Sequence, residues 1–181
     1  TLYREARWLE RADDIPAALE VYGRAFSLAP TDGAVLRALE RLASRETVDG
    51  AEHLVRALTL LADHQSQPDR RLEYEARAIQ LMEEALDDIP AAFERLNVAW
   101  RATQRSALVP ELRRLLGQMR EREIGDPAAG VVALREGLLA RVDMTWDVPD
   151  QVNALLTLSE IEADDARDLP AAAKVFLEEV V

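Results

Sequence analysis

Apolar side chains recur three and four residues apart along most of this chain, the spacing that places them on one face of an α-helix. The clearest example is a pair of stripes formed by Ile79, Met82 and Leu86 and then by Phe93, Leu96 and Trp100. No segment of useful length alternates between apolar and polar residues, as a half-buried strand does. We therefore predict an all-α fold in which paired helices bury facing stripes.

Proline and aspartate mark where the predicted helices begin. A proline in the first turn of a helix loses no hydrogen bond, and an aspartate just before that turn accepts a free backbone N–H. Prolines of this kind are Pro16, Pro90, Pro110, Pro127 and Pro170, and the preceding aspartates are Asp14, Asp88, Asp126 and Asp168. The predicted helices are 1–12, 15–28, 32–45, 49–63, 68–86, 89–103, 107–122, 127–142, 148–165 and 168–181. Taken in order, they form about five antiparallel helical hairpins.

A six-residue phrase occurs three times, at 13–18, 87–92 and 167–172, and each copy ends in Pro-Ala-Ala. The copies are separated by about twice the 34 to 47 residues of known helical-hairpin repeats. A hairpin in such an array buries its apolar face only by stacking on its neighbours, which builds an elongated superhelix. We therefore predict one α-solenoid over residues 1–181 without an internal domain boundary, and we expect it to be a fragment of a longer repeat array.

Composition agrees with a helical protein and excludes several other classes. Of the 181 residues 49% are hydrophobic, and the chain has no cysteine, so it has no disulfide, thiolate metal ligand or cysteine nucleophile. No apolar run approaches the about 20 residues that span a bilayer, so we expect no membrane insertion. Lys174 is the only lysine beside many arginines, which favours a GC-rich bacterial genome. A cytoplasmic location is favoured, and export stays open.

Candidate catalytic and metal-binding groups are weak. His53 and His64 are about three helical turns apart, too far to hold one metal ion, and are expected to be surface or boundary residues. Paired carboxylates such as Asp13 and Asp14 precede helix starts, where capping explains them. The chain lacks a G-x-S-x-G elbow and a glycine-rich phosphate loop. Its net charge of −12 and pI near 4.7 oppose nucleic-acid binding. We predict no enzymatic activity, no cofactor and no metal.

Several positions resemble the tetratricopeptide repeat. Its second helix carries two small residues, an aromatic residue between them and a closing proline, as do Ala18, Tyr22, Ala25 and Pro30. The large, small and large positions of its first helix are matched by Leu2, Ala6 and Leu9, and again by Tyr74, Ala78 and Leu81. The resemblance implies a right-handed superhelix whose first helices line a concave peptide-binding groove. Leu2 and Leu9 replace the usual Trp and Tyr, and the uneven repeat lengths imply a less regular groove.

Arginines form a stripe on the first helix of each of the first two hairpins. The stripes are Arg4, Arg7 and Arg11, and then Arg37, Arg41 and Arg45, at three- and four-residue spacing. Arg7, Arg11, Arg37, Arg41 and Arg45 are therefore the candidate groove residues for an acidic peptide or a terminal carboxylate. The alternative is that nearby acids neutralise the stripes as ordinary surface pairs. Those acids are Glu5, Glu10, Glu40 and Glu46.

Negative charge is concentrated in the last part of the chain. From residue 143 onward, two basic residues stand against ten acidic ones, a net charge of −8 out of −12. Asp147, Asp150, Glu160 and Glu162 are the candidate surface for a basic partner, with attraction that weakens as salt is added. The alternative is a pair of solvated helices whose acids only keep the chain soluble.

The three tryptophans have different expected roles. We expect Trp8 and Trp100 to pack in the core of their hairpins. Trp146 lies in a polar connector, where it either covers the seam between two hairpins or stands exposed as an anchor for a partner.

These features favour a noncatalytic scaffold that binds a protein or peptide partner on its concave face. The alternative is a structural spacer inside a large multidomain protein, which would show a featureless concave surface. A regulatory domain fused to an enzyme is a more remote alternative.

Overall fold

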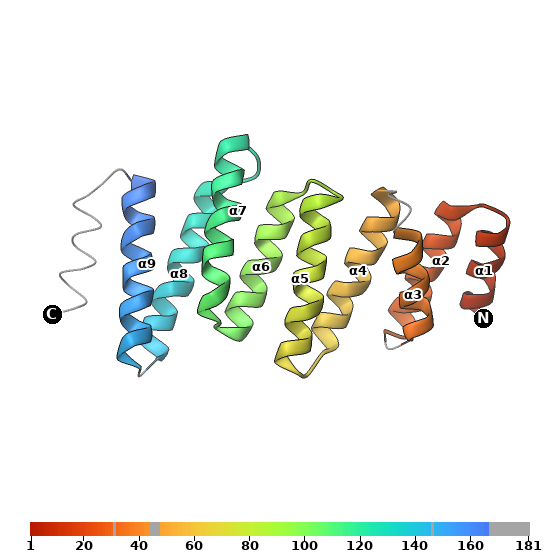
Figure 1. Cartoon of the computed structure of the whole chain (residues 1–181), viewed down its shortest axis with the longest axis horizontal. Helices are drawn as coiled ribbons and strands as arrows, with labels where there is room; N and C mark the ends of the chain where they lie inside the picture. Colours follow the sequence, from red (N-terminus) through yellow and green to blue (C-terminus); the bar gives the residue numbers. More distant parts are fainter. Residues whose placement is uncertain (31, 44–47, 146, 167–181) are drawn as a thin grey trace. The chain divides into compact units, whose positions relative to one another are not determined.

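The computed structural model describes residues 1–30, 32–43, 48–145 and 147–166. All regular secondary structure in these ranges is helical (Figure 1). The α-helices are α1 (Leu2–Arg11), α2 (Ile15–Leu28), α3 (Gly33–Ala43), α4 (Val48–His64), α5 (Pro68–Glu84), α6 (Ile89–Thr103), α7 (Val109–Arg122), α8 (Pro127–Met144) and α9 (Val148–Ala166), and a 3₁₀ turn, η1, covers Ser106–Leu108. The all-α prediction is confirmed for the described ranges. The predicted helix 168–181 lies outside them.

The repeated phrase builds the same turn at its first two copies. Asp13 and Asp87 have φ of 60° and 50°, the left-handed conformation that ends one helix, and aspartate tolerates it better than most residues. The next residue then caps the following helix. The Asp14 carboxylate accepts the N–H of Ala17 at 3.3 Å, and Asp88 makes the equivalent contact at 3.1 Å. These two carboxylate pairs therefore form turns and caps, as predicted.

The chain divides into two compact units, residues 1–99 and residues 100–181, with the boundary inside α6. The hydrophobic pattern gives no sign of this boundary because the helix runs through it without interruption. The expectation of a single domain over 1–181 stays a prediction.

In the first unit, helices that are close in sequence pack on one another: α1 on α2, α2 on α3 and α4, α3 on α4, and α4 on α5. Small residues lie at the contacts, since Ala6, Ala18 and Ala78 are completely buried. The Tyr3 and Tyr22 rings meet edge to face, with centroids 5.8 Å apart. Ala6, Ala18, Ala78 and Tyr22, which carry the sequence resemblance, are therefore core positions.

In the second unit, α7 packs on α8 and α8 packs on α9. Trp100 is completely buried, as expected, and its ring lies against the backbone of Gly137 in α8. A Cβ atom at Gly137 would stand only 2.3 Å from Cζ3 of Trp100. Glycine at this position is therefore what allows the indole ring to lie so close to the helix.

Candidate partner-binding surface

The outer side of α1 carries three arginines and a tryptophan. Ala6 is buried on the inner side of this helix, where Leu2 and Leu9 pack against the core. Since each residue advances about 100° around a helix, the opposite side is formed by residues two positions away from these. Arg4, Arg7, Trp8 and Arg11 occupy that side, and all four are exposed.

Trp8 is 68% exposed, so the expectation that it packs in the core was wrong. Ala6 takes the buried position, and Trp8 lies about 200° further around the helix. The sequence did hold a signal for this placement, because Trp8 is four residues after Arg4 and three before Arg11. A residue that lies one helical turn after one arginine and one turn before another shares their solvent-facing side of the helix.

On α3, Arg41 is held by a carboxylate from the first hairpin. Its Nη2 lies 2.8 Å from both carboxylate oxygens of Glu10, which also accepts the hydroxyl hydrogen of Tyr22 at 3.1 Å. Burial and then the hydrogen bond to Glu10 raise the pKa of Tyr22 to about 12. Glu10 therefore neutralises Arg41, as the alternative interpretation of the stripe required.

Glu40 has a different partner from the one that this alternative supposed. It pairs with Arg77 of α5 at 2.5 Å, which links α3 to α5. Arg7, Arg11 and Arg37 are exposed, and none of them makes an ion pair with a carboxylate in the described ranges. Arg45 and Glu46 lie outside the described residues. Arg41 is thus neutralised by Glu10, whereas Arg7, Arg11 and Arg37 remain available to carboxylates of another molecule.

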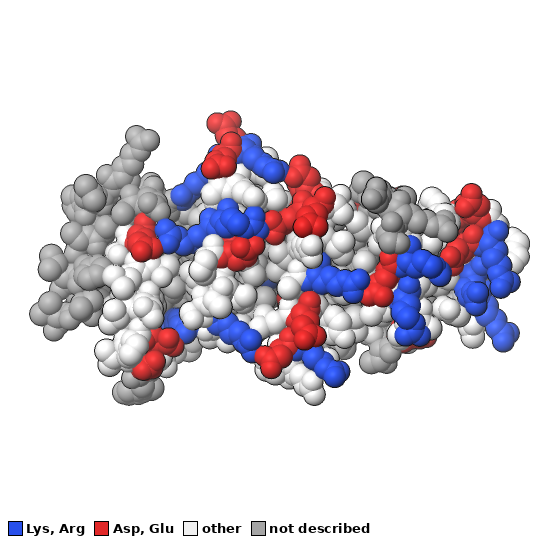
Figure 2. All heavy atoms as spheres, viewed as in Figure 1, with Lys and Arg blue, Asp and Glu red and all other residues white. Residues whose placement is uncertain are grey.

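We refer to Arg7, Trp8, Arg11 and Arg37 as the arginine surface. In Figure 2, basic side chains gather over α1 and α3. Guanidinium groups bind carboxylates through two parallel hydrogen bonds, and exposed tryptophan and arginine are the residues that contribute most to binding in many interfaces. This chemistry is suited to holding an acidic segment and supplies no nucleophile or general base.

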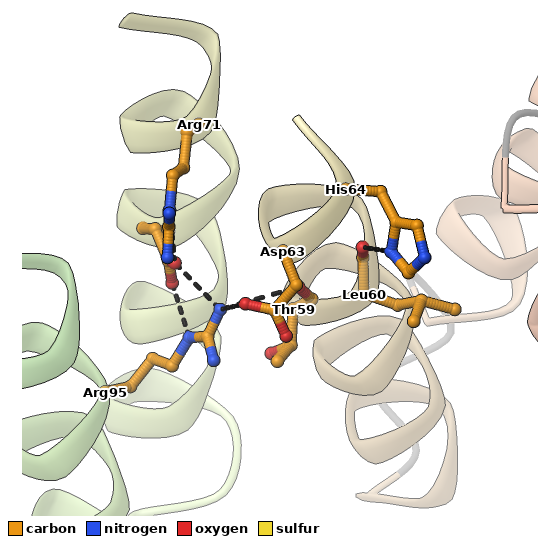
Figure 3. A network of polar contacts seen from close by, with 7 residues as sticks. Thr59, Leu60, Asp63, His64, Arg71 and Arg95 are labelled. Atoms are coloured by element: carbon orange, nitrogen blue, oxygen red, sulfur yellow. Dashed lines mark hydrogen bonds and ion pairs between the residues drawn. The ribbon is translucent and has the colours of Figure 1, made fainter. Parts of the chain in front are cut away.

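A second charged cluster of the first unit is centred on a buried carboxylate (Figure 3). Glu75 of α5 is 1% exposed, and its two oxygens accept hydrogen bonds from Arg95 of α6 at 2.5 and 2.7 Å. Arg95 also contacts Asp63 of α4 at 2.9 Å. Burial lowers the pKa of the Arg95 guanidinium, but the hydrogen bonds and charges of Glu75 and Asp63 outweigh it, so the pKa is raised. Because all these partners are internal, the cluster fastens three helices together.

Both histidines lie on α4, at the boundary or the surface as expected. His53 is half-buried, and burial followed by the charge of Arg56 lowers the pKa of its imidazole. His64 is exposed, and its Nδ1 lies 2.9 Å from the carbonyl oxygen of Leu60. No group of three or more histidine or carboxylate side chains that could hold a metal ion occurs within the described ranges.

In the second unit, two of the four acids that were predicted to meet a basic partner already form ion pairs with arginines. Asp150 accepts a hydrogen bond from Arg141 at 2.9 Å, and Glu160 pairs with Arg113 at 2.5 Å. Asp147 is exposed, and the side chain of Glu162 is outside the described set. A charge count along the chain did not show this pairing because Arg113 and Arg141 belong to α7 and α8. Trp146 also lies outside the described residues.

A groove of about 260 Å³ runs between α7 and α9, with Leu138 of α8 among its lining residues. Both ion pairs belong to its lining, so its charges are balanced by internal partners. The groove therefore shows no preference for a basic ligand over an acidic one.

No helix within the described ranges is long and apolar enough to cross a membrane. Comparison of the chain with protein-family models, with curated proteins and with solved structures finds no match.

Proposed function

We propose that this chain is an α-solenoid of tetratricopeptide-like hairpins and serves as a noncatalytic scaffold that binds an acidic segment of a partner protein on the arginine surface. Two observations support the fold. Helices close in sequence pack on one another within each unit, and the small residues of the resemblance, Ala6, Ala18, Ala25 and Ala78, are buried where helices meet. Close helix approach through small side chains is what stacked hairpins require.

One observation carries the binding proposal: Arg7 and Arg11 on α1 and Arg37 on α3 are exposed in a strongly acidic chain and make no ion pair within the described ranges. Acidic residues outnumber basic ones by 34 to 22, so carboxylates to neutralise arginines are abundant. Arg41 and Arg77 do take such partners. Guanidinium groups that remain open in these surroundings are available to carboxylates from another molecule.

The expected mode of binding has two parts. The three charges attract an acidic segment before contact, which raises the association rate and makes it sensitive to salt. After contact, the arginines hold carboxylates through paired hydrogen bonds, and Trp8 covers an apolar part of the segment. Trp8 is exposed and Trp100 is buried, so binding should change the fluorescence of Trp8 and leave that of Trp100 unchanged.

The test uses a fluorescein-labelled peptide of glutamate and aspartate only, titrated with the whole chain at low and moderate salt. Arg7→Glu/Arg37→Glu should weaken binding at least tenfold, since a hydrogen bond to a charged group contributes about 1.5 to 3 kcal/mol and 1.4 kcal/mol is a factor of ten. Circular dichroism should show unchanged helix content, because both side chains are exposed.

The matched control is Arg24→Glu/Arg56→Glu, the same change of charge on α2 and α4. It should leave binding of this peptide near the wild-type value. Equal losses in the two double variants would mean that the peptide responds only to net charge, and no binding to the wild-type chain would favour the structural spacer instead.

A further inference from the structure

A separate groove opens between α2 and α4, the second helices of the first two hairpins. Its volume is about 490 Å³, and its lining includes Phe26 and Leu28 from α2 and Leu60 from α4. Arg24 and Arg56 stand in the same lining, one from each helix. None of these side chains belongs to the arginine surface, which is carried by α1 and α3.

The groove depends on a close contact between Gly23 and His53. A Cβ atom at Gly23 would lie 2.8 Å from Nδ1 of His53, so the imidazole packs directly on the backbone of α2. His53 is half-buried there and its imidazole pKa is lowered, first by burial and then by Arg56, so the ring is neutral near pH 7. It contributes a polar but uncharged part of the groove wall.

Apolar surface is exposed at this groove. Leu28 is 79% exposed and Leu60 is partly exposed. These two leucines offer a partner an apolar surface, whereas Phe26, at 2% exposure, belongs to the core. Lining residues from Glu20 to Leu28 on α2 and from His53 to Leu60 on α4 extend for about two turns, or about 10 Å. That length matches two turns of another helix.

Within the lining of this groove, two basic side chains stand against one acidic side chain. Arg24 is exposed and makes no ion pair with a carboxylate in the described ranges. Arg56 is 73% exposed, and within the described part of the chain it makes one loose ion pair, with Glu52 at 3.6 Å, which contributes little in solvent. Glu20 is the one carboxylate in the lining. Two guanidinium groups, one on each wall, are therefore available to an acidic ligand.

We propose that this groove binds an acidic amphipathic helix of a partner protein. A leucine or phenylalanine of that helix inserts between Leu28 and Leu60, and carboxylates one turn before and after it pair with Arg24 and Arg56. Helices of this kind dock in apolar grooves through residues spaced one turn apart, and complementary charge at the rim selects them. The site differs from the arginine surface because it requires an apolar anchor as well as negative charge.

The test uses a fluorescein-labelled helical peptide in which two leucines one turn apart are flanked by glutamates, together with a second peptide that has serine in place of both leucines. We expect the wild-type chain to bind the leucine peptide at least tenfold more tightly than the serine peptide. Leu28→Ser and Arg24→Glu/Arg56→Glu should each lower the affinity for the leucine peptide at least tenfold. Leu28 suits this test because its side chain is exposed, so its replacement should leave the fold intact.

Arg70→Glu, an exposed change of the same kind on α5, is the control variant and should bind the leucine peptide as the wild type does. In NMR spectra, the His53 ring signals should shift on addition of this peptide. Absence of binding by the wild type, equal binding of the two peptides, or loss of binding only in the Arg7→Glu/Arg37→Glu variant would each overturn the proposal. The purely acidic peptide tests the arginine surface separately, so the two sites can fail independently.

Discussion

At the scale of single residues, Glu75 is the position at which charge and burial conflict most strongly. A buried carboxylate is costly unless it is paired and hydrogen-bonded, and Arg95 supplies both at 2.5 and 2.7 Å. Removal of Arg95 leaves the buried Glu75 carboxylate with the looser contact to Arg71 at 3.8 Å, and removal of Glu75 leaves Arg95 with Asp63. Removal of one partner should therefore lower the free energy of unfolding by more than the intact pair contributes to it.

Glu75→Ala should lower the free energy of unfolding by about 3 to 5 kcal/mol, the usual loss when one member of a buried pair is removed. Glu73→Ala, an exposed change on the same helix, is the control and should cost less than about 0.5 kcal/mol. The double variant Glu75→Leu/Arg95→Met should recover most of the loss, since an apolar replacement of both partners is often neutral. Equal losses in Glu75→Ala and Glu73→Ala by urea unfolding would show that the cluster is not structural.

Tyr22 makes the free energy of unfolding depend on pH in the alkaline range. Its pKa rises from 10.0 to about 12, first through burial and then through the bond to Glu10, so the folded state keeps the phenol protonated at a pH where the unfolded chain loses the proton. This contribution is complete below pH 10 and is lost as the pH rises toward 12. Tyr22→Phe should therefore show a flatter fall in unfolding midpoint above pH 10 than the wild type. Identical curves for the two proteins would contradict the assignment.

At the scale of elements, two glycines inside helices have opposite roles. A Cβ at Gly137 in α8 would collide with the Trp100 ring at 2.3 Å, whereas nothing lies within 4 Å of a Cβ at Gly117 in α7. Glycine costs about 1 kcal/mol relative to alanine inside a helix. Substitution by alanine should therefore relieve this cost at Gly117, whereas at Gly137 it should force the Trp100 ring and α8 apart.

Gly117→Ala should raise the free energy of unfolding by about 0.5 to 1 kcal/mol, and Gly137→Ala should lower it by about 1 to 3 kcal/mol, because overpacking outweighs the gain in helix propensity. Thermal unfolding followed by circular dichroism measures both. Each variant controls for the other, since the chemical change is the same. A stabilised Gly137→Ala protein would mean that Trp100 does not lie against α8.

At the scale of the whole molecule, the free energy of unfolding of the proposed solenoid is approximately the sum of the stabilities of its hairpins and of the contacts between neighbouring hairpins. In such arrays each hairpin is stabilised by its nearest neighbours, so a local defect opens its own region first. The two compact units, 1–99 and 100–181, give this expectation a natural division.

Hydrogen exchange can therefore test the proposed architecture. Gly137→Ala should raise amide exchange in α7 to α9 and leave α1 to α3 close to wild-type rates. Glu75→Ala should have the converse effect, with faster exchange in α4 and α5. A uniform rise along the chain in either variant would indicate one globally cooperative core instead of a solenoid.

Signals in the sequence located the α-helices of the described ranges. Asp14, Asp88 and Asp126 cap the helices they were expected to cap, and the three- and four-residue spacing marked core positions such as Phe93 and Trp100. These signals act within one helix or one turn, so they can be found without knowing what the helix packs against.

Which charges meet is set only by the packing of the helices against one another. Glu10 pairs with Arg41, and Glu75 is buried against Arg95. The Gly23 and His53 contact likewise joins α2 to α4. Each of these depends on distances between residues of different helices, and hydrophobic spacing along one helix carries no information about the neighbour that will cover it.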